Sequence, residues 1–334
     1  MKIEKNKSLK EFTTFKIGGS AQFFCAVENE EELVEAVAFS KAENLPIFVL
    51  GGGSNILISD EGFHGLVIKM EMKGVEYEGA RVTVQAGEDW DAFVEKTVEQ
   101  GLYGLENLSL IPGTVGAAPV QNIGAYGSEV KDTIESVRVF DTAENVFKDF
   151  LNHHCEFEYR NSLFKREAGR YIIVSTTFVL KKDGKVNIGY KDLRDYFSTK
   201  NLSQPTLQEV RNAVVEIRTN KLPDVRKVGT AGSFFKNPII THGQANELEK
   251  RFTGLPIFPV DDAYVKISLA WILDKVCGFK GVSKGNVGTY KNQALVLVNN
   301  GNATATEIIS FAEEIKKVVR KKTGIEIEEE VQRV

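Results

Sequence analysis

One residue whose side chain could take part in a reaction is Ser233, in the segment GTAGSFFKNP at residues 229–238. A hydroxyl that precedes Phe234 and Phe235 is expected to be half-buried, and it then needs a hydrogen-bond partner. In a site without water, such a hydroxyl can donate a proton to a reacting carbon. The segment does not match GxSxG and no His and Asp motif accompanies it, which argues against a serine hydrolase. The alternative is a structural turn or helix cap.

Two glycine-rich segments could bind a phosphate-bearing cofactor through their backbone. GGGSN at residues 51–55 follows an apolar run, and IPGTVGAAPVQNIGAYG spans residues 111–127. Glycine permits close approach and positive φ, and consecutive N–H groups in such loops form anion-binding nests. Neither segment is a P-loop or a complete GxGxxG fingerprint. The first could equally be a tight turn, and the second a compact surface loop. The amides Gln121 and Asn122 and the near-absence of charge favour a neutral heteroaromatic ring and a pyrophosphate.

The charged candidates carry weaker signals. Arg160 follows an aromatic residue, a context in which arginine is more often a surface residue than a catalytic one. The acidic run IEIEEEV at residues 325–331 is expected to be a solvated strand end, in which only an inward-facing glutamate would take part in chemistry. His153 and His154 are expected on one strand, where they would point to opposite faces. No partner ligands lie at metal-site spacing, so no metal site is predicted.

These residues need a framework of strands and helices to position them. The N-terminal part reads as an α/β unit, with a helix that begins after an Asn29 cap and an acidic first turn. Residues 221–224 (KLPD) interrupt a predicted helix, and a domain boundary is expected near them. Periodicity predicts strands at residues 22–27, 46–50, 65–68, 136–140, 171–175 and 294–298, helices at 89–99, 206–219 and 304–323, and a last strand that ends at 330–331.

Composition narrows the class of protein. The chain has 334 residues, enough for two or three domains, and its net charge of −4 argues against a mainly electrostatic nucleic-acid binder. No apolar run approaches the roughly 18 residues of a membrane span, and the N-terminus has no apolar core typical of a secretory signal. The three cysteines are widely spaced and predict neither a disulfide framework nor a CxxC metal site. We expect a cytoplasmic enzyme that binds neither nucleic acid nor membrane.

The ordered set of motifs closely resembles one family, the UDP-N-acetylenolpyruvoylglucosamine reductases. Any one motif is weak, but together they follow the family's order over nearly the whole chain. They are TTFKIGG at 13–19, GGGSN at 51–55, IPGTVGAAPVQNIGAYG at 111–127, YRNSLFK at 159–165, KLPDV at 221–225, GTAGSFFKNP at 229–238, AWILD at 270–274, NQALVLVN at 292–299 and IEEEV at 327–331. The wording of the long loop resembles the type I branch. Val225 departs from that branch, in which a second proline is frequent, but removes no catalytic group.

The resemblance implies an α+β fold in three parts. Residues 1–70 and 71–218 are expected to form a two-part FAD-binding domain of the PCMH, or vanillyl-alcohol-oxidase-like, type. Residues 219–334 are expected to form a C-terminal α+β substrate-binding domain, whose last strand returns toward the flavin.

The resemblance also implies a reaction, the NADPH-dependent reduction of UDP-N-acetylglucosamine enolpyruvate to UDP-N-acetylmuramate in peptidoglycan precursor synthesis. Hydride passes from NADPH to N5 of FAD and then to C3 of the enolpyruvyl group. Ser233 matches the position that gives a proton to C2, and Arg160 and Glu330 match the pair that binds and polarises the carboxylate. A vinyl ether that accepts hydride builds charge on C2 and the carboxylate, which explains the need for a cation and a proton donor.

The same resemblance assigns binding residues. FAD, bound without a covalent link, is expected to contact the cofactor residues Gly51, Gly52, Gly53, Ser54, Asn55, Pro112, Gly113, Thr114, Gly116, Ala117 and Gly124. The substrate is expected to contact Tyr126, Tyr190, Lys221, Asn237 and Gln293. Tyr190 lies in an extra loop of the type I branch that reaches the diphosphate, and Tyr126 could contact flavin or substrate.

Two other functions stay open at the level of sequence. A different FAD-dependent oxidase, for an alcohol or a lactone, would share GGGSN but not AGSFFKNP with a terminal Glu-Val. A sugar-nucleotide binding protein without activity would need no proton donor. The presence of Arg160, Ser233 and Glu330 together therefore argues against such a protein. The sequence leaves the preference for NADPH over NADH undetermined, and a monomer is expected.

Overall fold

The computed structural model describes residues 1–334, which form two compact units. Unit 1 contains residues 1–7, 21–52 and 63–219, and unit 2 contains residues 8–20, 53–62 and 220–334. The chain passes from one unit to the other inside GGGSN, between Gly52 and Gly53, and again inside helix α5. The three predicted parts, residues 1–70, 71–218 and 219–334, were defined by the function expected of each, and this division stays a proposal.

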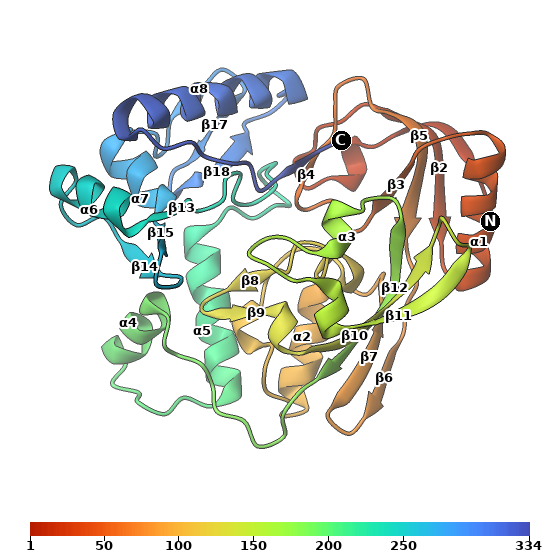
Figure 1. Cartoon of the computed structure of the whole chain (residues 1–334), viewed down its shortest axis with the longest axis horizontal. Coiled ribbons are helices and arrows are strands. Elements are labelled where there is room, and N and C mark those ends of the chain that lie inside the picture. The colour runs from red at the N-terminus through yellow and green to blue at the C-terminus, as the bar shows by residue number, and fades with distance from the viewer. The chain divides into compact units, whose positions relative to one another are not determined.

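Unit 1 holds two large sheets and the small two-stranded sheet β8-β9 (Figure 1). The first has the order β1-β2-β5-β3, in which β2 and β3 each pair with β5 in parallel. The second is the antiparallel sheet β11-β10-β12-β7-β6. The strands are β1 (Glu4–Ser8), β2 (Ser20–Val27), β3 (Ile47–Leu50), β5 (Phe63–Met70), β6 (Val75–Glu78), β7 (Arg81–Gln85), β8 (Gly124–Ala125), β9 (Ser128–Glu129), β10 (Ile134–Asp141), β11 (Val146–Leu151) and β12 (Tyr171–Val179).

The helices of unit 1 begin where the sequence supplies caps. Asn29 accepts a hydrogen bond from Glu32 N at 2.9 Å, and Asp89 accepts one from Ala92 N at 2.9 Å. These bonds satisfy N–H groups that a helix start leaves without a partner. The helices are α1 (Glu30–Ala42), α2 (Trp90–Glu99), α3 (Leu163–Arg166), α4 (Lys191–Thr199) and α5 (Leu207–Lys221), with short 3₁₀ turns η2 (Glu106–Leu108), η3 (Val115–Ala117), η4 (Val130–Asp132) and η5 (Asn152–Cys155).

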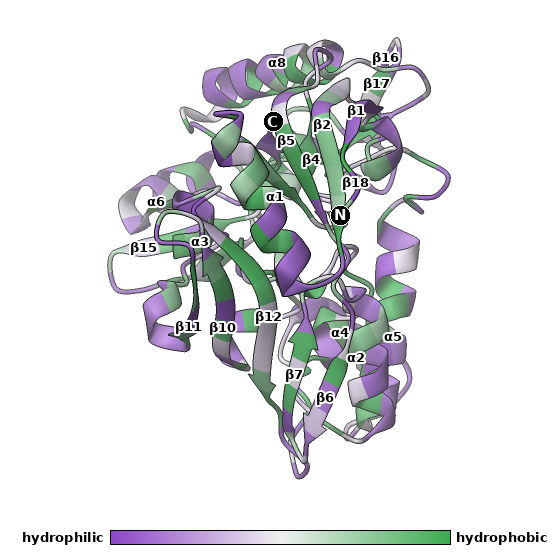
Figure 2. Ribbon diagram, turned by 90° about the vertical axis from the view of Figure 1, so that its right-hand side faces the viewer, coloured by the Kyte–Doolittle hydropathy of each residue, from purple (hydrophilic) through white to green (hydrophobic).

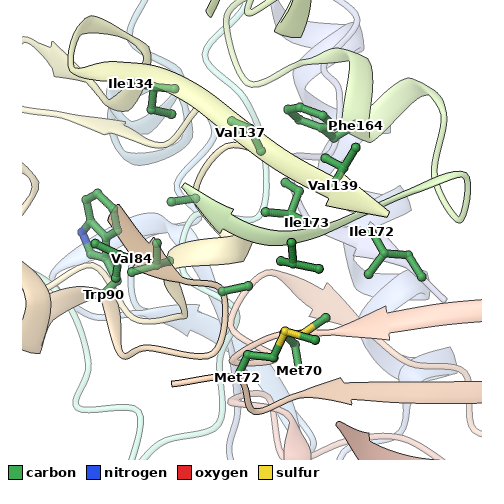
Figure 3. Packing of buried hydrophobic residues seen from close by; sticks show 14 of the residues in the cluster. Met70, Met72, Val84, Trp90, Ile134, Val137, Val139, Phe164, Ile172 and Ile173 are labelled. Atoms are coloured by element: carbon green, nitrogen blue, oxygen red, sulfur yellow. The ribbon is translucent and has the colours of Figure 1, made fainter. Parts of the chain in front are cut away.

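One hydrophobic cluster joins both sheets of unit 1 to α1 and α2. Strands β2 and β5 are green along most of their length in Figure 2, as expected for strands buried on both faces. Figure 3 shows side chains of the antiparallel sheet, among them Val84, Val139 and Ile173, together with Met70 and Met72 from the end of β5.

Unit 2 is built around the long helix α8 (Ala305–Thr323). A capping box between Thr304 and Glu307 starts α8, and Gly324, at φ 77°, ends it. Its apolar side chains belong to a second hydrophobic cluster. The other elements are η1 (Lys10–Phe12), β4 (Ile56–Leu57), β13 (Ile239–Thr241), α6 (His242–Arg251), β14 (Ile257–Pro259), β15 (Tyr264–Ile267), α7 (Leu269–Trp271), the π-turn η6 (Ile272–Val276), β16 (Ser283–Lys284), β17 (Val287–Tyr290), β18 (Gln293–Asn299) and β19 (Gln332–Arg333).

Two sequence predictions differ from the structure. The last strand, expected to end at residues 330–331, is β19 at Gln332–Arg333, where it pairs in parallel with β4. His153 and His154 lie in the 3₁₀ turn η5 and not on a strand, and their ring centroids are 3.9 Å apart. The tight turn brings consecutive side chains together, whereas a strand would separate them.

Candidate active site

In unit 1, the first glycine loop lies directly against the long loop. A Cβ on Gly51 would lie 2.7 Å from Thr114 Oγ1, and a Cβ on Gly52 would lie 2.7 Å from Gly113 Cα. The hydroxyl of Thr114 is buried and has no hydrogen-bond partner within the protein. Gly51 and Gly52 follow β3 at the carboxyl end of a parallel sheet, which is the usual place for a ligand in such sheets.

The rest of the predicted cofactor set lies along the same two loops. Gly116 packs so closely on Ala86 that a Cβ would lie 2.5 Å from the alanine Cβ. Pro112 is exposed, whereas Ala117 and Gly124 are half-buried. The lack of a side chain at Gly116 therefore allows its backbone to approach Ala86 closely.

Lys69 was not predicted as a site residue, yet its Nζ donates to Gly51 O at 2.7 Å. Burial lowers the pKa of this ammonium group. The negative charge of nearby Glu71 acts in the opposite direction but does not outweigh burial. A lysine inside the apolar strand FHGLVIKM was the available signal.

The long loop begins and ends at residues with left-handed backbone, Leu110 at φ 59° and Tyr126 at φ 49°. Helix α5 holds both ends through Arg218. Its Nε donates to Leu110 O at 3.2 Å, and its guanidinium hydrogen-bonds the hydroxyl of Tyr126. Burial raises the pKa of Tyr126 to about 12, although the charge of Arg218 opposes this rise, and burial lowers the pKa of Arg218.

A buried ion pair supports the same loop end. Asp91 in α2 accepts from Leu110 N at 2.6 Å and from Arg211 Nη1 in α5 at 2.7 Å. Arg211 is only 4% exposed. Sequence reasoning missed Asp91, Arg211 and Arg218. The arginines are spaced i and i+7 on α5, but only the fold reveals that this face meets the loop.

Asn122 connects the long loop to Glu158, which precedes the turn that carries Arg160. Its side-chain nitrogen donates to Glu129 Oε2 and to Glu158 O, each at 3.0 Å, and its oxygen accepts from Lys131 N at 3.2 Å. This fully buried amide therefore binds protein groups on both its nitrogen and its oxygen.

Arg160 lies in the turn after Glu158 with φ 56°, a conformation that is uncommon for arginine. Its Nη2 donates to Gly124 O at 2.8 Å, so the guanidinium lies on the long loop. The predicted substrate residues Tyr126 and Tyr190 also meet in unit 1, with ring centroids 5.5 Å apart and ring planes at 83°.

In unit 2, residues 13–19 support the second half of GGGSN. Gly53 has φ 63°, and a Cβ there would lie 1.9 Å from Phe12 O, so only glycine fits. Thr14 N donates to Gly53 O at 3.0 Å, and Thr14 Oγ1 donates to Thr230 O at 2.6 Å. The TTFKIGG segment thus links GGGSN to the segment that carries Ser233.

Ser233 lies on a central extended segment of unit 2. It forms a bridge with Val296 of β18, while its neighbour Phe234 accepts from Glu330 N at 2.8 Å. On the other side, Phe234 N donates to Leu295 O at 2.8 Å. The structure therefore brings the backbone segments of Ser233 and Glu330 side by side, although 97 positions (330 minus 233) separate them in sequence. Both residues are half-buried.

Asn55 contacts the Glu330 segment directly. Its Nδ2 donates to Glu330 O at 3.2 Å, and Asn55 O accepts from Gln332 N at 3.0 Å. Ser54, its neighbour in GGGSN, is half-buried.

The other predicted substrate residues of unit 2 are half-buried. Asn237 Oδ1 accepts from Leu269 N at 3.0 Å, which fixes the rotation of its amide. Lys221 and Gln293 follow directly, in sequence, two residues that hydrogen-bond each other. Asn292 Nδ2 donates to Asn220 O at 2.8 Å.

No helix of the structure is long and apolar enough to cross a membrane. No group of three or more His, Cys, Asp or Glu side chains could hold a metal ion.

The chain resembles known proteins over its whole length. Residues 21–148 match the family model of an FAD binding domain. Residues 224–334 match that of the UDP-N-acetylenolpyruvoylglucosamine reductase C-terminal domain.

Curated relatives agree with these matches. The UDP-N-acetylenolpyruvoylglucosamine reductase of Flavobacterium johnsoniae is 43% identical and covers 99% of both chains. That of Neisseria meningitidis serogroup B is 43% identical over 98% of this chain and 96% of its own length. The crystal structure of the Thermus caldophilus reductase superposes with a TM-score of 0.72 at 25% identity, over 100% of this chain and 99% of that one. The predicted family and the predicted FAD-binding α+β fold are confirmed, and the chain belongs to the UDP-N-acetylenolpyruvoylglucosamine reductases, FAD-dependent oxidoreductases of peptidoglycan precursor synthesis.

Proposed function

We propose that this chain reduces UDP-N-acetylglucosamine enolpyruvate to UDP-N-acetylmuramate, with NADPH as the electron donor and FAD held without a covalent bond. The observation that carries the proposal is the pairing in unit 2 of the Ser233 segment with the Glu330 segment through Phe234. The proposed proton donor Ser233 and the proposed carboxylate Glu330, distant in sequence, are thereby carried by neighbouring backbone segments, which is consistent with action at one site.

The residues of unit 1 fit FAD. Gly51 and Gly52 lie where any Cβ would collide with the long loop, and Thr114 offers a buried hydroxyl without a protein partner. In the proposal, the backbone of residues 51–55 holds the pyrophosphate, and Pro112, Gly113, Thr114, Gly116, Ala117 and Gly124 line the flavin. FAD bound there, once reduced by NADPH, would supply the hydride that the enolpyruvyl C3 accepts.

The catalytic roles follow from the charge that develops during reduction. Arg160 offers a fixed guanidinium to the substrate carboxylate, because its bond to Gly124 O restricts its rotation. Ser233 gives its proton to C2, and Glu330 helps to polarise the carboxylate end. A serine hydroxyl is a weak acid, so its contribution depends on its position.

Substrate binding is proposed for Tyr126, Tyr190, Lys221, Asn237 and Gln293. The ammonium group of Lys221 suits a diphosphate as a point charge. Tyr190 is 37% exposed, so part of this residue can be reached from solvent.

An anaerobic absorbance experiment tests the function. NADPH should bleach the flavin band of the purified protein, and UDP-N-acetylglucosamine enolpyruvate should then restore it. Bleaching without restoration would mean a different electron acceptor. Absence of a flavin band even after FAD is added would refute the proposal. A monomeric state and a cytoplasmic location are part of the proposal, and sedimentation and cell fractionation test them.

A further inference from the structure

We propose that Asn55 is a positioning residue for Glu330, which links the cofactor loop GGGSN to the carboxylate. The inference rests on the proposed function, because it assumes that Glu330 acts on the substrate. The family resemblance assigns Asn55 to FAD, and in the structure its side-chain amide and its carbonyl oxygen both hydrogen-bond the backbone around Glu330.

The contacts enclose Glu330 from both sides. Asn55 Nδ2 donates to the carbonyl of Glu330 at 3.2 Å, and Asn55 O accepts from Gln332 N, two residues further, at 3.0 Å. The amide N–H of Glu330 itself donates to Phe234 O at 2.8 Å. The peptide groups on both sides of the Glu330 Cα are therefore fixed, one by Asn55 and one by the neighbour of Ser233.

The chain beyond Glu330 extends this attachment. Strand β19 pairs in parallel with β4, which directly follows Asn55. Val334 N donates to Leu57 O at 3.0 Å, and Ser59 N donates to Val334 O at 2.7 Å. A two-stranded parallel pair is weak by itself. The side-chain bond of Asn55 therefore adds a contact at the carbonyl of Glu330, just before this pair begins.

A side chain that must be held in one position against the reacting group loses much of its effect when it shifts by about 1 Å. Replacement of Asn55 by alanine removes one bond to Glu330 O and leaves the carboxylate present but loosely held. The loss should therefore appear in the step that uses Glu330 and not in binding of FAD.

The test measures three quantities for Asn55→Ala, with Asn300→Ala as the matched control, since Asn300 is exposed and bonds Ser283 on the surface of unit 2. They are the FAD dissociation constant, the rate of flavin reduction by NADPH, and the rate of reoxidation by the enolpyruvyl substrate. For Asn55→Ala we expect the first two within about threefold of wild type and reoxidation slower by about tenfold or more. Asn300→Ala should match wild type in all three.

A double-mutant cycle separates positioning from a direct role. If Asn55 acts through Glu330, then Asn55→Ala should slow reoxidation no further in a Glu330→Gln background, because coupled residues are not additive. A variant that lacks residues 332–334 should also slow reoxidation and not flavin reduction, although the side chains of GGGSN are unchanged. It also serves as the second route if Asn55→Ala folds poorly.

Several outcomes would overturn the inference. An FAD dissociation constant raised by about tenfold, with reoxidation intact at saturating FAD, would make Asn55 a pyrophosphate ligand. Additive effects with Glu330→Gln, or unchanged reoxidation, would remove it from the Glu330 network. If wild-type flavin is reduced but not reoxidised by the substrate, the proposed function fails, and this inference with it.

Discussion

At the scale of single residues, the site depends on groups whose chemistry is ordinary but whose placement is constrained. Arg160 adopts φ 56° and Gly53 adopts φ 63°, and such conformations persist only where neighbours enforce them. Arg160 is fixed by its bond to Gly124 O, and Gly53 by the bond that its carbonyl accepts from Thr14 N. Ser233 follows Gly232, which has φ 75°, in a turn where Thr230 Oγ1 accepts from Gly232 N at 3.2 Å.

Ser233→Ala should affect only one half of the reaction. Reduction of the flavin by NADPH should stay within about twofold of wild type, since no proton is transferred to substrate in that step. Reoxidation by the enolpyruvyl sugar should slow by about 10²-fold or more, in the range found for loss of a positioned proton donor. Stopped-flow absorbance measures both rates, and Ser283→Ala provides a hydroxyl-deletion control. Equal slowing of both halves would contradict the role of Ser233.

Gly52→Ala tests the contact between the two glycine loops. The new Cβ would lie 2.7 Å from Gly113 Cα, a backbone atom that cannot move without displacing the long loop. We expect a cost of about 1–3 kcal/mol, seen as FAD affinity lowered by about tenfold or more in a fluorescence titration. Gly243→Ala is the control, because its nearest non-neighbouring atom would lie 3.9 Å away. Wild-type affinity in Gly52→Ala would show that the loops do not jointly hold the cofactor.

At the scale of elements, helix α5 determines the shape of the long loop. Arg218 bonds Leu110 O and Tyr126, and Arg211 holds the aspartate that binds Leu110 N. Both ends of the loop are thus attached to one rigid helix, and the residues between them need no regular structure of their own. Such attachment to a helix is how a glycine-rich loop can be preorganised.

Arg218→Met should loosen this loop. Leu110 O and the hydroxyl of Tyr126 each lose a donor in a buried setting, at a cost of about 1–3 kcal/mol. The pKa of Tyr126, already raised to about 12 by burial, should rise further without the positive charge. We expect a lower melting temperature and weaker FAD binding than in Arg194→Met, in which an exposed arginine of α4 is changed. Identical FAD affinity in the two variants would mean that α5 does not preorganise the loop.

At the scale of the whole molecule, stability should depend on pH through Glu329. This carboxylate is 11% exposed and lies 2.7 Å from both Lys316 Nζ and Arg333 Nε. Burial raises its pKa, but the hydrogen bonds from Arg333 and Lys316 outweigh that effect, so the pKa lies below the usual 4.5. Because the folded pKa is the lower one, the stabilisation is fully present above about pH 4.5 and is lost as the pH falls through the folded pKa.

Glu329→Gln should therefore lower the melting temperature at pH 7 by about 2–5 °C. The difference from wild type should shrink as the pH falls below about 4. Scanning fluorimetry across this range measures it. Glu326→Gln is the control, because Glu326 pairs with Arg320 on the surface and is 69% exposed. A difference that stays constant down to pH 3 would show that the charge of Glu329 does not stabilise the fold.

Sequence patterns were sufficient to predict the family, the cofactor class and several of the longer elements. Helices α2, α5 and α8 and strands β10 and β12 begin and end within a few residues of their predicted bounds, because caps and apolar periodicity are local signals. Strand β11 was not predicted. Helix α4 was missed, although Leu193 and Phe197 follow the i, i+4 spacing, because it is short.

Only the tertiary structure decided which segments meet. It placed Asn55 on the backbone of Glu330, Arg218 on the ends of the long loop, and Lys69 on Gly51. It also moved the last strand to Gln332–Arg333, where β4 supplies partners for its backbone. These contacts join residues far apart in sequence, and their energy depends on burial and on the pairing of backbone groups. No local pattern of side chains encodes such pairing, so it could be seen only once the chain was folded.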